Sequence, residues 1–123
     1  MTVHQITRNL TFLLLFFLAG CYYDIEEDLY ASIDCQKIDM SYQSDILPII
    51  QNNCYVCHDA KSNFGNIILE GYDNLKNYAD NGFLLGVIKH EAGFSPMPQN
   101  NNQLLECEIE KIESWISDGA RNN

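Results

Sequence analysis

The stretch that decides the fold is Cys54-Tyr55-Val56-Cys57-His58, near the middle of a chain of 123 residues. Two thiols at this spacing can each form a thioether with one vinyl group of a haem. The histidine that follows directly can donate its imidazole to the iron. The motif therefore predicts one covalently attached c-type haem, held by Cys54 and Cys57, with His58 as the proximal ligand.

Two other kinds of site also use a Cys-x-x-Cys pair. A thioredoxin-like dithiol lies in a βαβ unit, and no such pattern surrounds Cys54 and Cys57. A closed zinc site needs a fourth ligand beside these two cysteines and His58, and the chain has no second Cys/His pair at ligand spacing. The haem interpretation is therefore favoured over both alternatives.

The second axial ligand of the iron is expected from a Pro-, Gly- and Asn-rich loop further along the chain. Met97 lies in this loop between Pro96 and Pro98, which restrict the backbone on both sides of it. A lone methionine is more often core packing than a ligand. Pro-Met-Pro in a loop after Cys-x-x-Cys-His nevertheless favours thioether coordination by Met97, with His90 as the alternative ligand.

Helical periodicity is visible on both sides of the haem motif. Ile46, Ile49 and Ile50 fall on one face of a helix that is expected to begin at Ser44 and to end around Cys57 or His58. Two short helices are expected at 72–79 and 83–90, each after a glycine-containing break. The domain is therefore predicted to be all-α, with about four short helices around the haem.

The strongest helical pattern is the last one, at 104–118. One face of this helix is expected to be apolar and buried, and its members are Leu105, Ile109, Ile112 and Ile116, with Trp115 beside them. Trp115 is expected to be a core aromatic. Gly119 is expected to end the helix, because a glycine tolerates the left-handed conformation common at that position.

The first 20 residues have the pattern of an export signal. Arg8 precedes a short apolar run at 10–19, which is shorter than the ~20 residues needed to span a bilayer. The sequence Leu18-Ala19-Gly20-Cys21 resembles the lipobox of bacterial lipoproteins, whereas the alternative is an ordinary signal peptide with a chance cysteine. We expect removal of residues 1–20 and a lipid on Cys21, which would anchor the chain to a membrane in the periplasm or at the cell surface.

The residues after the signal are expected to form a tether and then a domain. Residues 21–38 are acidic and have no sustained helical or strand period, so an extended tether is predicted there, followed by the domain at 39–123. Of the 5 cysteines, Cys35 and Cys107 have no role in haem attachment or lipidation. In an oxidising compartment they are predicted to form a disulfide that fastens the end of the tether to the last helix, with two buried free thiols as the alternative.

The charge balance excludes one class of partner. The chain has 17 acidic and 7 basic residues, which gives a net charge of −10. Nucleic acid binding is therefore not expected, because phosphate recognition needs clustered Lys and Arg. An acidic surface suits solubility or the steering of a basic partner.

With these residues in hand, the chain resembles the small single-haem class I cytochromes c, and more narrowly the exported bacterial lipoproteins that carry one such domain. The segments that carry the resemblance are 46–58, 94–98 and 109–120. The resemblance implies a mostly helical fold in which the first and last helices cross beside the haem. It also implies covalent haem c on Cys54 and Cys57, and iron held by His58 and Met97.

The expected function is electron transfer by a membrane-tethered carrier, not an enzyme. If both axial positions of the iron are filled, no small-molecule substrate needs to bind, and the partners are redox proteins. The alternative is a haem-based catalyst or gas sensor, in which the sixth ligand must leave easily.

Overall fold

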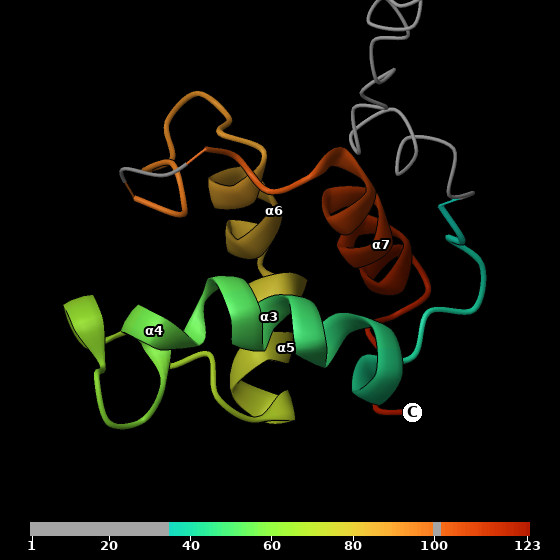
Figure 1. Cartoon of the computed structure of the whole chain (residues 1–123), viewed down its shortest axis with the longest axis horizontal. Coiled ribbons are helices and arrows are strands. Elements are labelled where there is room, and N and C mark those ends of the chain that lie inside the picture. The colour runs from blue at the N-terminus through green and yellow to red at the C-terminus, as the bar shows by residue number, and fades with distance from the viewer. Residues whose placement is uncertain (1–34, 100–101) are drawn as a thin grey trace, which may run out of the picture. The chain divides into compact units, whose positions relative to one another are not determined.

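The computed structural model describes residues 35–99 and 102–123, so the predicted signal peptide, Cys21 and most of the tether lie outside the described residues. The described residues form helices and no strand, in the order η1 (Tyr42–Ile46), α3 (Leu47–Asn53), α4 (Tyr55–His58), η2 (Phe64–Asn66), α5 (Tyr72–Asp80), α6 (Phe83–Ile88) and α7 (Glu106–Ser117) (Figure 1). The prediction of an all-α domain is confirmed. None of the helices in this part of the chain has both the length and the apolar character needed to cross a bilayer.

The helix that leads into the haem motif begins earlier than predicted. Its N-cap is Ser41 and not Ser44, because the Ser41 hydroxyl accepts the Ser44 N–H at 3.4 Å and the Asp45 carboxylate accepts the Ser41 N–H at 2.9 Å. The π-helical turn η1 runs directly into α3, where Pro48 lies in the first turn and no N–H donor is required of it. Cys54 then separates α3 from α4, with φ −117° and ψ −36°.

The hydrophobic core is formed by one face of each of η1, α3, α5, α6 and α7. Its largest fully buried side chains are Ile46, Ile50, Leu75, Ile88, Ile112 and Trp115. The ring of Trp115 stacks on Tyr42 at a centroid distance of 6.0 Å, and its Nε1–H donates to the Arg121 carbonyl at 2.9 Å. The predicted buried face of the first helix and the predicted core position of Trp115 are therefore confirmed.

Helix α7 differs from its prediction at the start. Leu105 is 73% exposed, whereas its neighbour Leu104 is 7% exposed and belongs to the core. Leu105 is the N-cap, with φ −56° and ψ 142°, so the helical period that begins at Glu106 does not extend back to it. Gly119 follows the helix at φ 91°, as predicted.

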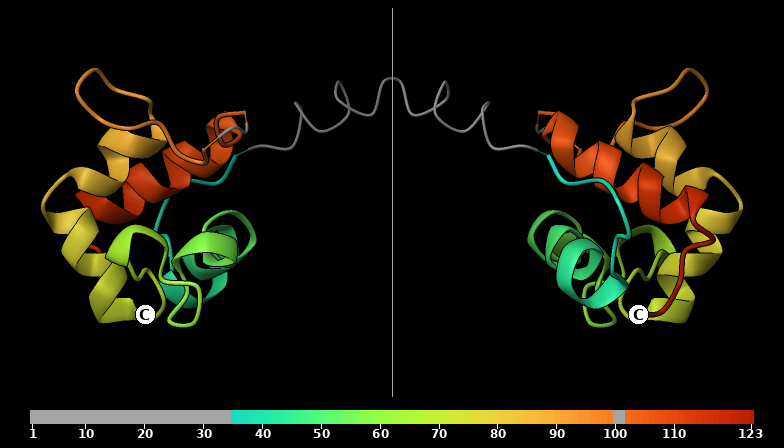
Figure 2. Two further views of the ribbon diagram at one scale, coloured as in Figure 1. Left: turned by 90° about the vertical axis from the view of Figure 1, so that its left-hand side faces the viewer. Right: turned by 90° about the vertical axis from the view of Figure 1, so that its right-hand side faces the viewer.

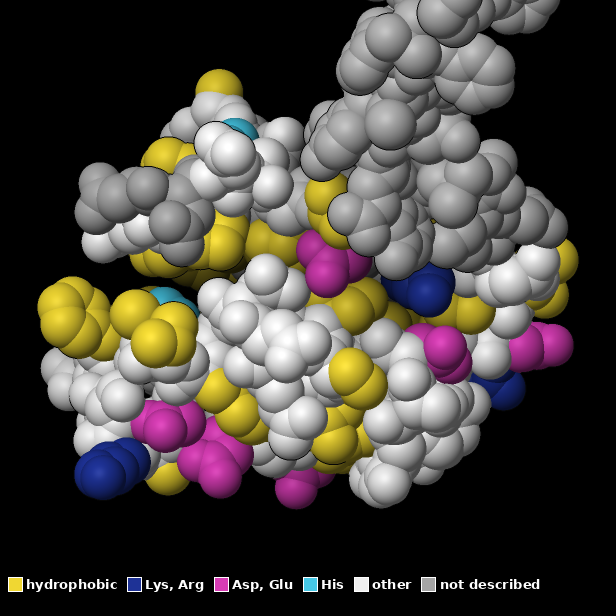
Figure 3. Space-filling view, in the orientation of Figure 1, with side chains coloured by type: hydrophobic (Ala, Val, Ile, Leu, Met, Phe, Trp, Pro, Cys, Tyr) yellow, Lys and Arg dark blue, Asp and Glu magenta, His cyan; other side chains and the backbone are white. Residues whose placement is uncertain are grey.

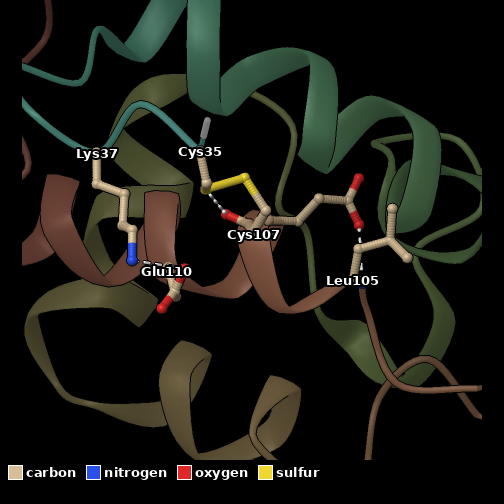
Figure 4. The surroundings of a disulfide bond; sticks show 6 residues. Cys35, Lys37, Leu105, Cys107 and Glu110 are labelled. Atoms are coloured by element: carbon tan, nitrogen blue, oxygen red, sulfur yellow. Dashed lines mark hydrogen bonds and ion pairs between the residues drawn. A yellow bond between two sulfur atoms is a disulfide. The ribbon is translucent and has the colours of Figure 1, made fainter. Parts of the chain in front are cut away.

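The segment before η1 is fastened along α7 (Figure 4). The sulfur atoms of Cys35 and Cys107 are joined at 2.02 Å, as predicted from the cysteine assignment. Lys37 forms an ion pair with Glu110 at 2.8 Å, and its carbonyl accepts the hydroxyl of Ser114. The compact unit consequently begins at Cys35, four residues before the predicted domain start at 39.

The end of the chain closes on η1. The Asn123 carbonyl accepts the Ser41 hydroxyl at 2.7 Å and the Gln43 N–H at 3.1 Å, and the Asn123 side-chain oxygen accepts the Tyr42 N–H at 3.0 Å. Both side views show the C-terminus close to the first helical turn, η1, which is drawn in teal (Figure 2). Helix α7 also contacts η1, so the first and last helices of the described domain are held together.

Candidate functional site

The haem motif opens onto a cavity of about 440 Å³, within the range of roughly 300–1,000 Å³ that is usual for cofactor and ligand pockets. All four predicted haem-binding residues line it: Cys54, Cys57, His58 and Met97. The rest of the lining is mainly apolar, with Val56, Phe64, Ile67, Ile88, Pro98 and Leu104 beside Asn53, Gly65 and Gln99. The space-filling view shows hydrophobic side chains in a hollow between the α3–α4 layer and the α6 region (Figure 3).

A smaller apolar hollow of about 50 Å³ shares three lining residues with the main cavity: His58, Ile67 and Met97. Its other walls are Leu69, Tyr78, Phe83, Leu84 and Val87, mostly from α5 and α6. His58 and Met97 thus both border the same two spaces. The fold brings these two distant residues of the sequence to one place.

The His58 ring is hydrogen-bonded to a backbone carbonyl, which selects its tautomer. Its Nδ1 lies 3.2 Å from the Ile67 carbonyl oxygen. A carbonyl can only accept a hydrogen bond, so Nδ1 carries the proton and the Nε2 lone pair is left for a metal. The His58 carbonyl in turn accepts the Leu69 N–H at 2.8 Å, so the segment 67–69 fixes both the ring and the backbone of His58.

The two thiols of the motif are free in this structure but differ in their surroundings. The Cys54 carbonyl accepts the N–H groups of Cys57 at 3.1 Å and of His58 at 2.9 Å, which forms the α4 turn that presents the motif. Cys57 is exposed, whereas Cys54 is partly buried at the α3–α4 junction. Burial raises the pKa of the Cys54 thiol to about 11, and the negative charge of Glu108 adds to the increase.

The backbone of Met97 is bonded on both sides. Its N–H donates to the Val87 carbonyl at 3.0 Å, and its carbonyl lies 3.0 Å from Nε2 of His90. The peptide bond between Met97 and Pro98 is cis. His90, the alternative ligand, is exposed and lines neither cavity, so the structure places Met97 and not His90 with the haem motif.

Three residues of the site were not predicted from the sequence. Ile67 acts through its backbone carbonyl, for which the residue type gives no signal. Leu104 lines the cavity, but the periodicity assigned the buried position to Leu105 instead. Phe64 lies in a polar loop without periodicity, so only the tertiary structure places it at the cavity.

The donor set fits the c-type haem that the sequence predicts. The cavity offers two thiols, one imidazole and one thioether, together with apolar walls. Among residues 35–99 and 102–123, no group of three or more His, Cys, Asp or Glu side chains is placed to hold a metal ion by itself. No protein-family model, curated protein or solved structure matches this chain.

Proposed function

We propose that residues 35–123 form a class I cytochrome c domain that carries one covalent haem and transfers single electrons. The observation that carries the proposal is the cavity lined together by Cys54, Cys57, His58 and Met97. These are the groups that thioether attachment and His/Met ligation require. The helical architecture, with η1 in contact with α7, is consistent with the fold that the sequence resembles.

Each of the four residues has a distinct role in this proposal. Cys54 and Cys57 would hold the macrocycle through thioethers. His58 would present Nε2 to the iron, because its Nδ1 is bonded to the Ile67 carbonyl, and Met97 would supply its sulfur as the other protein ligand. When bound, the haem supplies a one-electron ferrous/ferric couple, whose potential a His/Met pair raises relative to other ligations.

We infer a carrier and not an enzyme, because two protein ligands leave no open position on the iron for a substrate. The mainly apolar lining of the cavity would place a bound haem in surroundings of low polarity. Val56 and Phe64 line the cavity but are 77% and 67% exposed, so this edge of the site is open to other proteins. Redox partners typically bind through small, short-lived interfaces, as this edge would allow.

Export and lipid anchoring through Cys21 are also part of the proposal. They rest on the signal sequence and the lipobox resemblance, which lie outside the described residues. The disulfide between Cys35 and Cys107 is consistent with an oxidising compartment such as the periplasm or the cell surface. The net charge of −10 disfavours nucleic acid as a partner.

A haem-based catalyst or gas sensor is the second candidate function. One observation favours it: Met97 is supplied by a loop and not by a helix, so its thioether can leave the iron without unfolding a helix. In that case an external ligand would bind where Met97 is displaced.

Absorbance spectra of the haem-loaded protein test both candidates. The full chain would be produced in a host that attaches haem, and its mass would show the addition of one haem. For an electron carrier we expect low-spin spectra, a ferric sulfur-to-iron band and no response of the ferrous protein to carbon monoxide. High-spin spectra or ready carbon monoxide binding would instead support the catalyst or sensor.

The ligand assignment has a matched control within the chain. Met97→Ala should abolish the sulfur-to-iron band, whereas Met40→Leu should preserve it, because Met40 is a core residue that is 4% exposed. A host that attaches haem to other proteins but leaves this one without haem would contradict the proposed roles of Cys54, Cys57 and His58.

A further inference from the structure

The loop that supplies Met97 is anchored to α6 at several points. The Glu91 N–H donates to the Gly86 carbonyl at 3.0 Å, and the Phe94 N–H donates to the Glu91 carbonyl at 3.1 Å. Further along, the Met97 N–H donates to the Val87 carbonyl at 3.0 Å. The loop therefore leaves α6, turns, and returns to the same helix immediately before Met97.

Phe94 lies at the turn of this loop and packs directly against Gly86. A Cβ atom at Gly86 would lie 2.6 Å from Cε2 and 2.7 Å from Cδ2 of the Phe94 ring. Atoms in van der Waals contact are about 3.5–4.0 Å apart, so no side chain larger than hydrogen can occupy this position while the ring stays in place. Gly86 is in the helical region, so space and not backbone conformation requires the glycine.

The Phe94 ring also contacts the wall of the site. It meets Phe83 edge to face, with centroids 5.4 Å apart and an interplanar angle of 78°. Phe83 in turn packs edge to face with Tyr78 at 6.4 Å. Phe83 and Tyr78 line the smaller hollow together with His58 and Met97. A continuous chain of packed side chains thus runs from the loop turn to the residues that border the iron site.

We propose that Phe94, seated on Gly86, is the positioning residue that holds the Met97 thioether on the iron and keeps external ligands out. The inference rests on the proposed function, since it needs Met97 as the sixth ligand. The backbone bonds at Val87 and His90 fix the main chain of Met97. The Phe94 ring fixes the loop against α6, so that the side chain of Met97 cannot swing away with the loop.

The test is a double-mutant cycle on the haem-loaded full chain, read out by carbon monoxide affinity of the ferrous protein and by reduction potential. Phe94→Ala should raise the carbon monoxide affinity by about tenfold or more, because the apparent affinity follows the fraction of molecules in which Met97 is off the iron. The potential should fall, because His/Met ligation raises it. Gly86→Ala should do the same by displacing the ring.

The combined variant makes the test specific to the contact. In the Phe94→Ala background, Gly86→Ala should change the carbon monoxide affinity by less than about twofold, since the ring that it would strike is gone. Equal effects of Gly86→Ala in both backgrounds would overturn the proposal. If Gly86→Ala alone does not fold, the carbon monoxide affinities of Phe94→Ala and of the combined variant still test the proposal.

Two further variants separate this inference from a general loss of stability and from failure of the proposed function. Ile112→Val, in the core of α7 and outside both cavities, should lower stability without opening the site to carbon monoxide. If Met97→Ala opens the site but Phe94→Ala does not, the positioning role is wrong and the ligation stands. If Met97→Ala changes neither the spectrum nor carbon monoxide binding, the proposed ligation itself fails.

Discussion

The two cysteines of the haem motif lie three positions apart, yet their surroundings give them different reactivity. Cys57 is exposed on α4. Cys54 lies at the α3–α4 junction, where burial and then the charge of Glu108 raise its thiol pKa to about 11. Since the thiolate is the nucleophile, the two thiols should differ in any reaction that begins from the haem-free protein.

We predict that iodoacetamide alkylates Cys57 of the haem-free protein well before Cys54. A thiol with a pKa of about 11 is roughly one part in a thousand thiolate at pH 8, and this fraction rises about tenfold per pH unit up to pH 11. Peptide mass spectrometry over time at pH 7, 8 and 9 would give both rates. Cys54 should react slowly and with a steep dependence on pH.

The control for this prediction is the same reaction in concentrated urea. Unfolding exposes both thiols, so the two rates should converge there. Equal rates in buffer, with no change on adding urea, would contradict the burial of Cys54 at the α3–α4 junction.

Single residues also show where sequence reasoning ends. The predicted roles of Cys54, Cys57 and His58 follow from their spacing alone, and all three residues line the cavity. The partner of the His58 ring is a backbone carbonyl at Ile67, which any residue type could provide. The packing of Phe94 against Gly86 brings a loop residue onto a helix residue. This contact depends on how the loop returns to α6, so the sequence alone did not predict it.

At the scale of helices, the helix starts that are marked by a glycine were predicted well. Helices α5 (Tyr72–Asp80) and α6 (Phe83–Ile88) lie close to their predicted ranges, because Gly71 and Gly82 precede them as N-caps. The boundaries that depend on side-chain caps were less well predicted, since Ser41 and Ser44 are both acceptable caps and tertiary packing of Tyr42 selects the earlier one. Leu105 was also mispredicted at a helix boundary, because it is the N-cap of α7 and lies outside the helical period.

We predict that Gly71→Ala destabilises the protein more than Gly82→Ala. Gly71 has φ 90° and ψ 147°, a region essentially restricted to glycine, where another residue costs about 1–3 kcal/mol. Gly82 has φ 76° and ψ −2°, close to the left-handed helical region that other residues enter at a cost of about 1–2 kcal/mol. Urea unfolding of the haem-loaded protein would give the free energies.

Steric clashes do not contribute to the difference between these two variants. A methyl group at Gly82 would meet nothing within 4 Å, and one at Gly71 would meet only Asn74 Nδ2 at 3.9 Å. Any difference between the variants therefore reports backbone conformation. An equal or smaller loss of stability in Gly71→Ala would mean that α5 does not begin at Gly71 in the conformation described.

At the scale of the whole molecule, the ends of the described chain are both secured to α7 or η1. The Cys35–Cys107 disulfide joins residues 72 apart in the sequence, and Asn123 closes on Ser41, Tyr42 and Gln43. No residue of this closure lines either cavity of the site. The closure should therefore contribute stability to the domain without changing the haem ligands.

We predict that replacing both Cys35 and Cys107 by serine lowers the free energy of unfolding by up to about 4 kcal/mol. The chain-entropy model gives this upper figure for a closed loop of 72 residues, because the unfolded chain gains freedom when the cross-link is removed. The haem spectra and the reduction potential should stay unchanged, since the ligands lie elsewhere. Urea unfolding and a potentiometric titration would measure the two quantities.

The matched control is Lys37→Ala, which removes the neighbouring contact on the same segment without touching the disulfide. The Lys37–Glu110 pair is 45% and 34% exposed, and exposed ion pairs contribute about 0–1 kcal/mol. Lys37→Ala should therefore lower the free energy of unfolding much less than removal of the disulfide does. If the serine variant is no less stable than Lys37→Ala, the disulfide does not constrain the unfolded chain. If the serine variant also shifts the potential, the effect reaches the site through Glu108, which is next to Cys107 and accepts the side-chain N–H of the cavity residue Asn53 at 3.4 Å.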